Sequence, residues 1–231
     1  MAGSRQHTEG RLRAWPGKVT GSAPVGLQPL MLGAVRDSYL YVPVGYRTER
    51  LAPLILLLHG AGGHARQGLD LLRSLADATG IILLAPASRE RTWDLPVGRR
   101  YGPDVTMIDR ALEQMFSRNA IDPTRLAIGG FSDGASYALS LGITNGDLFT
   151  HVLAFSPGFM APAGRRGSPR VFVSHGTRDG VLPIGPCSRK IVPQLKRADY
   201  EVRYREFDGG HTIPPEIALE AVHWFTQHKL L

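Results

Sequence analysis

The sequence contains a single cysteine, Cys187, among 231 residues. One thiol excludes an internal disulfide and every metal site built from several thiolates, so we expect a protein of a reducing compartment, the cytoplasm by default. Long apolar runs are also absent, because the run at residues 54–58 is far too short to cross a bilayer. The first thirty residues contain no apolar segment typical of a signal peptide. We therefore predict a soluble protein with no stable membrane insertion.

A dense basic stripe interleaved with aromatic residues, as many nucleic-acid-binding proteins have, is missing as well. The chain carries 27 Lys and Arg against 20 Asp and Glu, a formal net charge of +7, but the basic residues are scattered, mostly as arginine pairs. Scattered charge is typical of a solvated basic surface. We therefore expect no nucleic-acid partner, and the sequence carries no signal for an oligomeric state.

What is present is the composition of an ordinary globular protein, with 43% hydrophobic and 20% charged residues. A chain of this length with that apolar share can bury a substantial core as one domain. Its first 28 residues are rich in Gly, Ser, Pro and Arg, with only isolated apolar positions. We therefore expect a loose basic arm over residues 1–28 and one folded domain over residues 29–231.

After residue 28, short apolar runs alternate with longer helix-like segments. The runs that begin at Leu54, Ile81, Leu126 and Val171 are continuously apolar, as strands buried on both faces must be. This pattern predicts an α/β protein with a mostly parallel central sheet flanked by helices, and a tight polar link at residues 33–37 favours an antiparallel hairpin for the first two strands. The expected strands are residues 30–32, 38–42, 54–58, 81–85, 125–128, 151–155, 170–174 and 201–206. The expected helices are residues 65–79, 103–118, 133–143, 186–198 and 215–228.

Ligands of such sheets bind at the carboxyl ends of the strands, and one of these ends carries a candidate nucleophile. Gly130-Phe131-Ser132-Asp133-Gly134 follows a predicted strand and precedes a predicted helix. This is the setting of a nucleophile elbow, in which bulky residues two positions before or after the serine would collide with the strand or helix. The alternative is a glycine-rich turn in which Ser132 only caps the helix.

A serine nucleophile needs a base, and the base needs a group that orients it. Asp179 and His211 each follow a separate predicted strand, so Ser132, Asp179 and His211 occur in the chain order of the triad of α/β-hydrolases. Asp208 is the alternative acid, because it lies three residues before His211 and could orient it locally.

An oxyanion hole requires two backbone N–H groups directed at the developing negative charge. One is expected from Asp133, the residue after the nucleophile, whose side chain is expected to act only as a carboxylate at the helix N-terminus. The other is expected from Ala61, in the glycine-rich turn at residues 58–63. We assign His59 to bracing that turn and give the remaining histidines, His175 among them, no catalytic role.

Together these segments resemble a serine esterase of the α/β-hydrolase fold. The similarity is to the carboxylesterase/phospholipase type and to esterases related to polyhydroxybutyrate depolymerases, and it covers residues 30–231. The resemblance implies hydrolysis of esters or thioesters without a metal or cofactor, Ser132, Asp179 and His211 as the triad, and the amides of Ala61 and Asp133 as the oxyanion hole. It also disfavours dienelactone hydrolases, whose nucleophile is a cysteine, since we expect Cys187 to lie in a helix.

The segment at residues 155–168 is too short to carry a helical cap, so we expect an open pocket. Six residues are expected to form an apolar wall for the acyl group: Trp93, Leu95, Phe159, Met160, Leu182 and Ile213. A shallow wall predicts short acyl groups, so the expected activity is hydrolysis of small-molecule carboxylic esters through an acyl-enzyme. The alternatives are an acyltransferase, thioesterase or peptidase with the same triad, or a non-catalytic binding protein on this scaffold.

Overall fold

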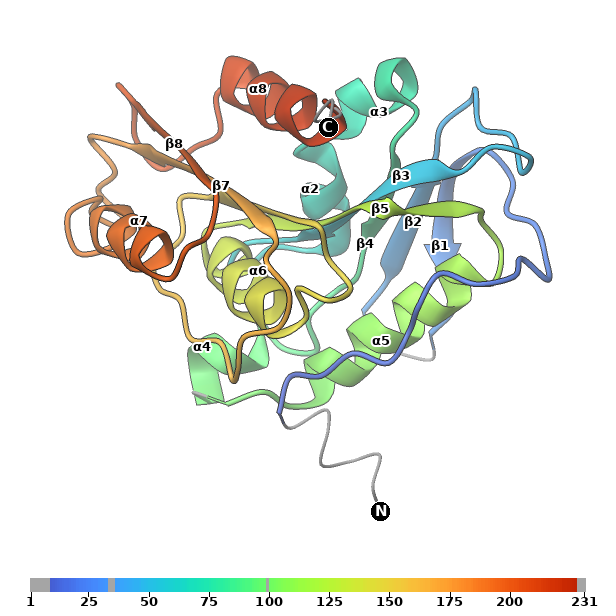
Figure 1. The fold of residues 1–231 in the computed structure, drawn as a ribbon, viewed down its shortest axis with the longest axis horizontal. Coiled ribbons are helices and arrows are strands. Elements are labelled where there is room, and N and C mark those ends of the chain that lie inside the picture. The colour runs from blue at the N-terminus through green and yellow to red at the C-terminus, as the bar shows by residue number, and fades with distance from the viewer. Residues whose placement is uncertain (1–8, 33–35, 99, 228–231) are drawn as a thin grey trace.

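The computed structural model describes residues 9–32, 36–98 and 100–227 and is built around one eight-stranded sheet (Figure 1). Its strand order is β1-β2-β4-β3-β5-β6-β7-β8. The pairs β1–β2 and β2–β4 are antiparallel, and all other neighbours are parallel. The strands are β1 (Gly26–Leu30), β2 (Ser38–Val42), β3 (Ala52–Leu58), β4 (Ile82–Ala85), β5 (Ile121–Phe131), β6 (His151–Phe155), β7 (Arg170–Gly176) and β8 (Val202–Phe207). The predicted α/β class with a mostly parallel sheet is therefore confirmed.

Helices cover both faces of the sheet. Figure 1 shows α2, α3 and α8 on one face and α4, α5, α6 and α7 on the other. The helices are α2 (Ala65–Asp70), α3 (Arg73–Thr79), α4 (Asp94–Gly98), α5 (Pro103–Phe116), α6 (Asp133–Thr144), α7 (Ser188–Arg197) and α8 (Pro215–Thr226). The expected helix at residues 65–79 is two helices, because Leu72 leaves helical geometry at φ −133° and ψ 1° and buries its side chain in the core. The short helix α4 was not predicted.

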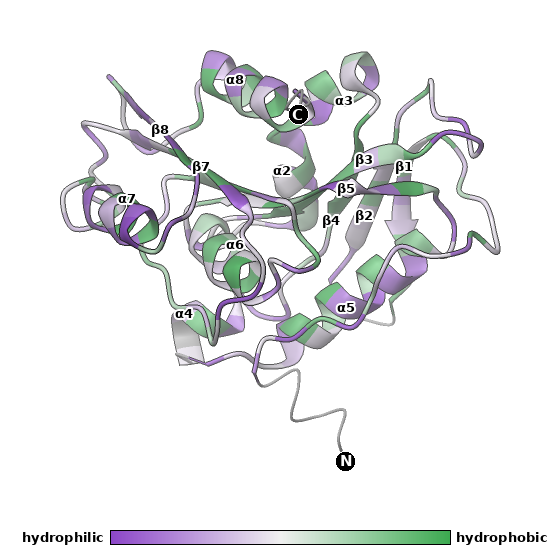
Figure 2. Ribbon diagram, viewed as in Figure 1, coloured by the Kyte–Doolittle hydropathy of each residue, from purple (hydrophilic) through white to green (hydrophobic). Residues whose placement is uncertain are grey.

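Strand β3 shows why the central runs are continuously apolar. Leu54, Leu56 and Leu58 belong to the core layer that includes residues of α5, α6 and α7, whereas Ile55 and Leu57 belong to the layer under α2, α3 and α8. Because successive side chains of a strand point to opposite faces, a strand with helices on both faces needs apolar residues at every position. Figure 2 shows the corresponding green at the centre of the sheet.

The first strand lies earlier than predicted. We expected residues 30–32 to pair with the second strand, but β1 is Gly26–Leu30, and Leu30 pairs with Ser38. Pro29 is tolerated within β1 because this strand lies at the edge of the sheet, where one side of the backbone needs no partner. The antiparallel pairing is confirmed, while residues 33–35 of the expected link lie outside the described residues.

The described part of the expected loose arm is docked on the domain. Arg11 forms an ion pair with Asp147 at 2.8 Å, and Leu12, only 4% exposed, donates its amide to the Asn145 side chain. The amides of residues 13 and 14 both donate to one oxygen of Asp109. The expectation of a loose arm is therefore wrong for these residues, because two buried side chains supply the hydrogen-bond partners that the irregular backbone needs. Residues 1–8 lie outside the described residues, and the domain boundary at residue 29 stays a prediction.

The carboxyl edge of the parallel strands is left open. The segment from residue 156 to 169 joins β6 to β7 without a helix or a strand of its own, so no cap domain covers this edge. Within the ranges that the structure describes, no helix combines the length and apolar character that crossing a membrane requires.

Candidate active site

Ser132 occupies the sharp turn between β5 and α6. Its backbone has φ 58° and ψ −122°, a region that a residue with a side chain rarely adopts, and its amide donates to the Phe155 carbonyl at 3.0 Å. The side chain makes no hydrogen bond that caps α6. The geometry is therefore that of a nucleophile elbow rather than of a simple helix cap.

Glycines flank the elbow because backbone segments approach one another there. A Cβ atom at Gly130 would lie 2.7 Å from the Leu58 carbonyl oxygen and 2.5 Å from the carbonyl carbon of Gly134. A Cβ atom at Gly134 would collide with the same Leu58 oxygen and lie 2.5 Å from the His59 carbonyl oxygen. Both glycines thus bring β3, β5 and the first turn of α6 together, which places Ser132 beside the turn that follows β3.

The structure brings Ser132, His211 and Asp179 into one chain of hydrogen bonds. His211 Nε2 lies 2.9 Å from Ser132 Oγ, and His211 Nδ1 lies 2.6 Å from Asp179 Oδ2. An ionised carboxylate can only accept, so Nδ1 carries the proton and Nε2 is free to accept the serine proton. Because β7 and β8 are parallel neighbours, their following loops meet at the same edge, and this holds Asp179 beside His211.

The Asp179 carboxylate is buried and held by the backbone. Its Oδ1 accepts hydrogen bonds from the amides of Val181 at 2.9 Å and Leu182 at 2.8 Å. Burial by itself raises the pKa of Asp179, but the hydrogen bonds from His211 and the two amides outweigh it, so the pKa lies below its usual value. Asp208, the alternative acid, is 79% exposed at its side chain and pairs with Arg178 at 3.0 Å instead. The geometry therefore favours Asp179.

His175, for which no catalytic role was predicted, also lies beside this carboxylate. Its Nε2 is 2.7 Å from the Leu182 carbonyl oxygen and 3.2 Å from Asp179 Oδ2, and its Nδ1 is 2.7 Å from the Ser188 hydroxyl. A carbonyl can only accept, so Nε2 carries the proton and Nδ1 accepts from the hydroxyl. The buried ring thus ties the Asp179 loop to the start of α7. The only sequence signal is its place four residues before Asp179, at the end of β7.

The turn after β3 lies next to the elbow, since a Cβ atom at Gly60 would be 3.4 Å from the Ser132 Cβ. The Gly62 amide donates to the Arg91 carbonyl and the Gly63 amide to the Gly60 carbonyl, whereas no backbone hydrogen bond among the described residues engages the Ala61 amide. The Asp133 amide belongs to the first turn of α6, where N–H groups have no intrahelical partner. Both amides predicted for an oxyanion hole are therefore available as donors.

His59 braces this turn, in agreement with its predicted structural role. Its Nδ1 lies 2.8 Å from the Gly60 carbonyl oxygen, and its Nε2 accepts from the Ser88 amide at 3.1 Å. Burial lowers the pKa of His59 to about 4, so the ring is neutral at pH 7 and keeps its proton on Nδ1. This neutral tautomer fixes the backbone beside Ala61.

The Asp133 side chain and Trp93 support the same region. Asp133 Oδ2 accepts from the Thr92 hydroxyl at 2.8 Å, so this carboxylate ties α6 to the loop after β4. The Trp93 indole N–H donates to the His59 carbonyl at 2.9 Å, and its ring stacks on Tyr137. The prediction that Trp93 lines the acyl wall is wrong, because the side chain is 0% exposed in the core.

The other predicted wall residues divide between two sides of the site. Leu95 is buried in the core, so it is also wrong as a wall residue. Phe159 and Met160 are half-buried against the core, and Leu182 packs against Gly158, 3.3 Å from the position of a Cβ atom there. Ile213 lies elsewhere, in a groove beside His211.

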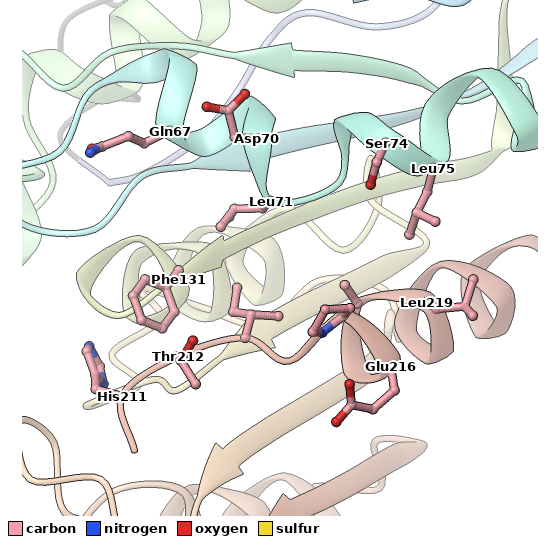
Figure 3. A pocket seen from close by; sticks show the side chains of 13 residues that line it. Gln67, Asp70, Leu71, Ser74, Leu75, Phe131, His211, Thr212, Glu216 and Leu219 are labelled. Atoms are coloured by element: carbon pink, nitrogen blue, oxygen red, sulfur yellow. The ribbon is translucent and has the colours of Figure 1, made fainter. Parts of the chain in front are cut away.

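That groove runs between α2–α3 and α8 and has a volume of about 830 Å³ (Figure 3). Phe131 lines the groove next to His211, and the centroids of the two rings lie 4.6 Å apart. A smaller cavity of about 350 Å³ at the turn of residues 59–63 shares Phe131, Leu71 and Gln67 with it. The residues that line the larger groove are Gln67, Asp70, Leu71, Ser74, Leu75, Phe131, His211, Thr212, Ile213, Pro215, Glu216, Ala218 and Leu219.

Cys187 is not part of the elbow. It is the residue before α7 rather than part of the helix, and burial raises the pKa of its thiol. In residues 9–32, 36–98 and 100–227, no three His, Cys, Asp or Glu side chains are grouped so that they could hold a metal ion.

Comparisons with known proteins find similarity to esterases and to a thioesterase. The chain is 28% identical over 159 residues to the bifunctional acetylxylan esterase/xylanase XynS20E of Neocallimastix patriciarum, covering 65% of this chain and 22% of that protein. It is 30% identical over 124 residues to acyl-protein thioesterase 1 of Gibberella zeae, covering 48% of this chain and 51% of that protein. The chain thus spans about half or less of the length of these two relatives.

The fold is that of the α/β-hydrolases. The crystal structure of esterase PE8 superposes with a TM-score of 0.67 and 22% identity, covering 87% of this chain and 98% of that one. The likeness to esterases related to polyhydroxybutyrate depolymerases stays a prediction. The phospholipase/carboxylesterase family model matches residues 103–229, more than half of the chain and the part that contains Ser132, Asp179 and His211. The chain belongs to the phospholipase/carboxylesterase family.

Proposed function

We propose that this protein hydrolyses carboxylic esters through an acyl-enzyme on Ser132. The observation that carries the proposal is the hydrogen-bond chain from Ser132 Oγ through His211 to the buried Asp179, at 2.9 and 2.6 Å. In this reaction the serine oxygen attacks the ester carbonyl carbon while its proton moves to His211 Nε2. Asp179 orients the ring and stabilises its positive charge. The amides of Ala61 and Asp133 donate to the oxyanion.

Collapse of the first tetrahedral intermediate breaks the bond to the alcohol oxygen, which takes the proton from His211 Nε2 and leaves as the alcohol. A water molecule then attacks the acyl-enzyme while His211 takes one of its protons. Expulsion of the serine oxygen, reprotonated by His211, releases the carboxylic acid. The cycle needs no oxidant or second substrate besides water.

The acyl group is proposed to be small. The segment between β6 and β7 is short, Phe159 packs against the core and Leu182 packs against Gly158, so we expect only a shallow surface for an acyl chain. A short acyl ester dissolved as a monomer should therefore be preferred, without faster turnover on droplets. Cytoplasmic location, which the single thiol favours, belongs to this proposal as well.

Thioester hydrolysis is the second candidate, because one relative is an acyl-protein thioesterase. The same triad attacks both kinds of ester, so turnover of an oxygen ester and of the thioester with the same acyl group distinguishes the two. An oxygen ester turned over faster than its matched thioester would support the first proposal.

Active-site labelling tests the nucleophile. A fluorophosphonate should modify the protein once, and peptide mapping should place the modification on Ser132. Ser132→Ala should lose both labelling and turnover of a short model ester, whereas Ser168→Ala, which changes an exposed serine remote from the elbow, should retain both. Normal turnover by a folded Ser132→Ala variant would refute the proposed mechanism.

A further inference from the structure

The groove between α2–α3 and α8 meets the site at His211. Both His211 and Phe131 line it, and the two rings lie against each other with centroids 4.6 Å apart. Leu182 and Gly158 do not line it, and Gly158 donates its amide to Ser136 of α6, a helix on the opposite face of the sheet. The groove therefore extends from the histidine, away from the surface proposed for the acyl group.

The position of His211 indicates which half of an ester this groove can hold. In the proposed reaction, His211 Nε2 delivers its proton to the alcohol oxygen, so that oxygen must lie next to the imidazole when the ester bond breaks. The carbonyl oxygen is directed to the amides of Ala61 and Asp133. The substituent on the alcohol oxygen is then directed along the His211 side, where the groove begins.

The groove also has a size and lining suited to a substantial substituent. Its volume of about 830 Å³ is within the roughly 300–1,000 Å³ typical of small-molecule sites. Leu71, Leu75, Ile213 and Leu219 give it apolar walls, and Leu219 is 40% exposed. Figure 3 shows Leu75 on the α3 side and Leu219 on the α8 side of the groove. An apolar portion of the alcohol can therefore be buried between α3 and α8.

The charge of the lining has the opposite sign to that of the whole chain. The chain has a net charge of +7, yet the groove is lined by two carboxylates, Asp70 and Glu216, and by no Lys or Arg among the described residues. Neither carboxylate has a hydrogen-bond or ion-pair partner in the part of the chain that the structure describes. Unpaired charge of one sign along a cleft attracts ligands of the other sign and repels those of the same sign.

We propose that this groove binds the alcohol portion of the ester and selects neutral or cationic alcohols over anionic ones. The inference rests on the proposed ester hydrolysis by Ser132, and it adds the substrate class: a small acyl group on a larger, uncharged or positively charged alcohol with an apolar part.

Three acetate esters of similar size test the charge selection. They are acetylcholine, its neutral analogue 3,3-dimethylbutyl acetate, and the acetate ester of 2-hydroxyethanesulfonate. We expect kcat/KM to fall in that order, with a cation-to-anion ratio of at least about fivefold, because one exposed charge pair changes affinity roughly two- to fivefold. A ratio near one, or a preference for the sulfonate, would overturn the charge selection.

A double variant that neutralises both groove carboxylates tests whether the groove causes the charge selection. Asp70→Asn/Glu216→Gln should bring the cation-to-anion ratio close to one. The matched control Glu49→Gln/Glu113→Gln makes the same change in net charge at exposed positions before β3 and on α5, remote from the groove, and should leave the ratio unchanged. Equal effects of the two double variants would mean that overall charge, not the groove, sets the preference.

A bulky substitution tests which half of the ester enters. Ser74 is an exposed residue on α3 that lines the groove, so Ser74→Trp should fill it without disturbing the core. We expect kcat/KM for 3,3-dimethylbutyl acetate to fall at least about fivefold, while ethyl esters of increasing acyl length keep their wild-type profile. A changed acyl-length profile with unchanged alcohol dependence would assign the groove to the acyl group and overturn the proposal. Ethyl acetate turnover and fluorophosphonate labelling report separately on the proposed function itself.

Discussion

The carboxylate of Asp179 accepts hydrogen bonds from the His211 ring and two backbone amides, and the His175 ring lies beside it. His211 and His175 both approach Oδ2, and the amides of Val181 and Leu182 donate to Oδ1. The hydrogen bonds from His211 and the two amides keep this buried carboxylate ionised, which is why the pKa of Asp179 lies below its usual value although burial opposes this. An ionised Asp179 in turn keeps the proton of His211 on Nδ1, the tautomer that base catalysis by Nε2 requires.

Replacing this acid should therefore impair chemistry more than binding. Asp179→Asn should lower kcat for a short ester by on the order of 10⁴-fold, because an amide can hold His211 in the wrong tautomer. KM should change little. Asp208→Asn is the matched control, since Asp208 is exposed and pairs with Arg178, and it should keep nearly full activity. A larger loss from Asp208→Asn would exchange the two assignments.

At the scale of the elements, the site depends on how closely β3 approaches the first turn of α6. The carbonyl groups of Leu58 and His59 occupy the space in which a side chain at Gly134 would start. This close approach sets the distance between the turn that carries Ala61 and the elbow that carries Ser132. The required spacing is therefore built into the backbone packing of two elements that are distant in the sequence.

Gly134→Ala should destabilise the protein and separate these elements. We expect a loss of about 3 kcal/mol or more in the free energy of unfolding, because the new methyl group meets rigid backbone rather than a movable side chain. Urea unfolding followed by circular dichroism measures the loss. Gly45→Ala adds the same methyl group where no atom lies within 4 Å, and it should change stability by less than about 1 kcal/mol. Similar stability of the two variants would contradict the close packing.

At the scale of the whole molecule, buried neutral histidines make the fold sensitive to acid. Burial lowers the pKa of both His59 and His151 to about 4, whereas an unfolded histidine titrates near 6.5. Between these two values the unfolded chain binds protons that the folded protein excludes. The free energy of unfolding contributed by each ring is therefore full above pH 6.5 and is lost as the pH falls toward 4. Asp104 acts in the opposite direction, because burial raises its pKa to about 6.

His151→Gln isolates one of these contributions at a position remote from the elbow, where the ring packs edge-on against Trp224 and Phe225. Between pH 7 and pH 4.5, the stability difference between wild type and variant should shrink by roughly 2 to 3 kcal/mol, about 1.4 kcal/mol for each pH unit in which only the unfolded ring is protonated. Urea unfolding at several pH values measures this difference. His59 and Asp104 contribute equally to the stability of wild type and variant, so their contributions cancel in this difference. A stability difference that does not vary with pH would mean that His151 titrates alike in both states.

Local sequence patterns were enough to predict the class of fold and the position of the sharp turn at Ser132. Strands such as the one at residues 54–58 are recognisable because a strand covered on both faces must be apolar at every position. The elbow is recognisable because close backbone approach demands glycine at 130 and 134, whatever the rest of the chain does. Ser132, Asp179 and His211 each follow a separate strand, so their order along the chain could also be read from the sequence.

Only the tertiary structure decided which side chains face one another. It distinguished Asp179 from Asp208, buried Trp93 under the His59 turn, placed His175 against Asp179 and docked the segment around Leu12. The groove likewise exists only because α2, α3 and α8, far apart in the chain, lie on the same face of the sheet. The physical reason is that strands and sharp turns are specified by residues that are close along the chain. Burial, hydrogen-bond partners and cavities depend instead on how distant segments pack.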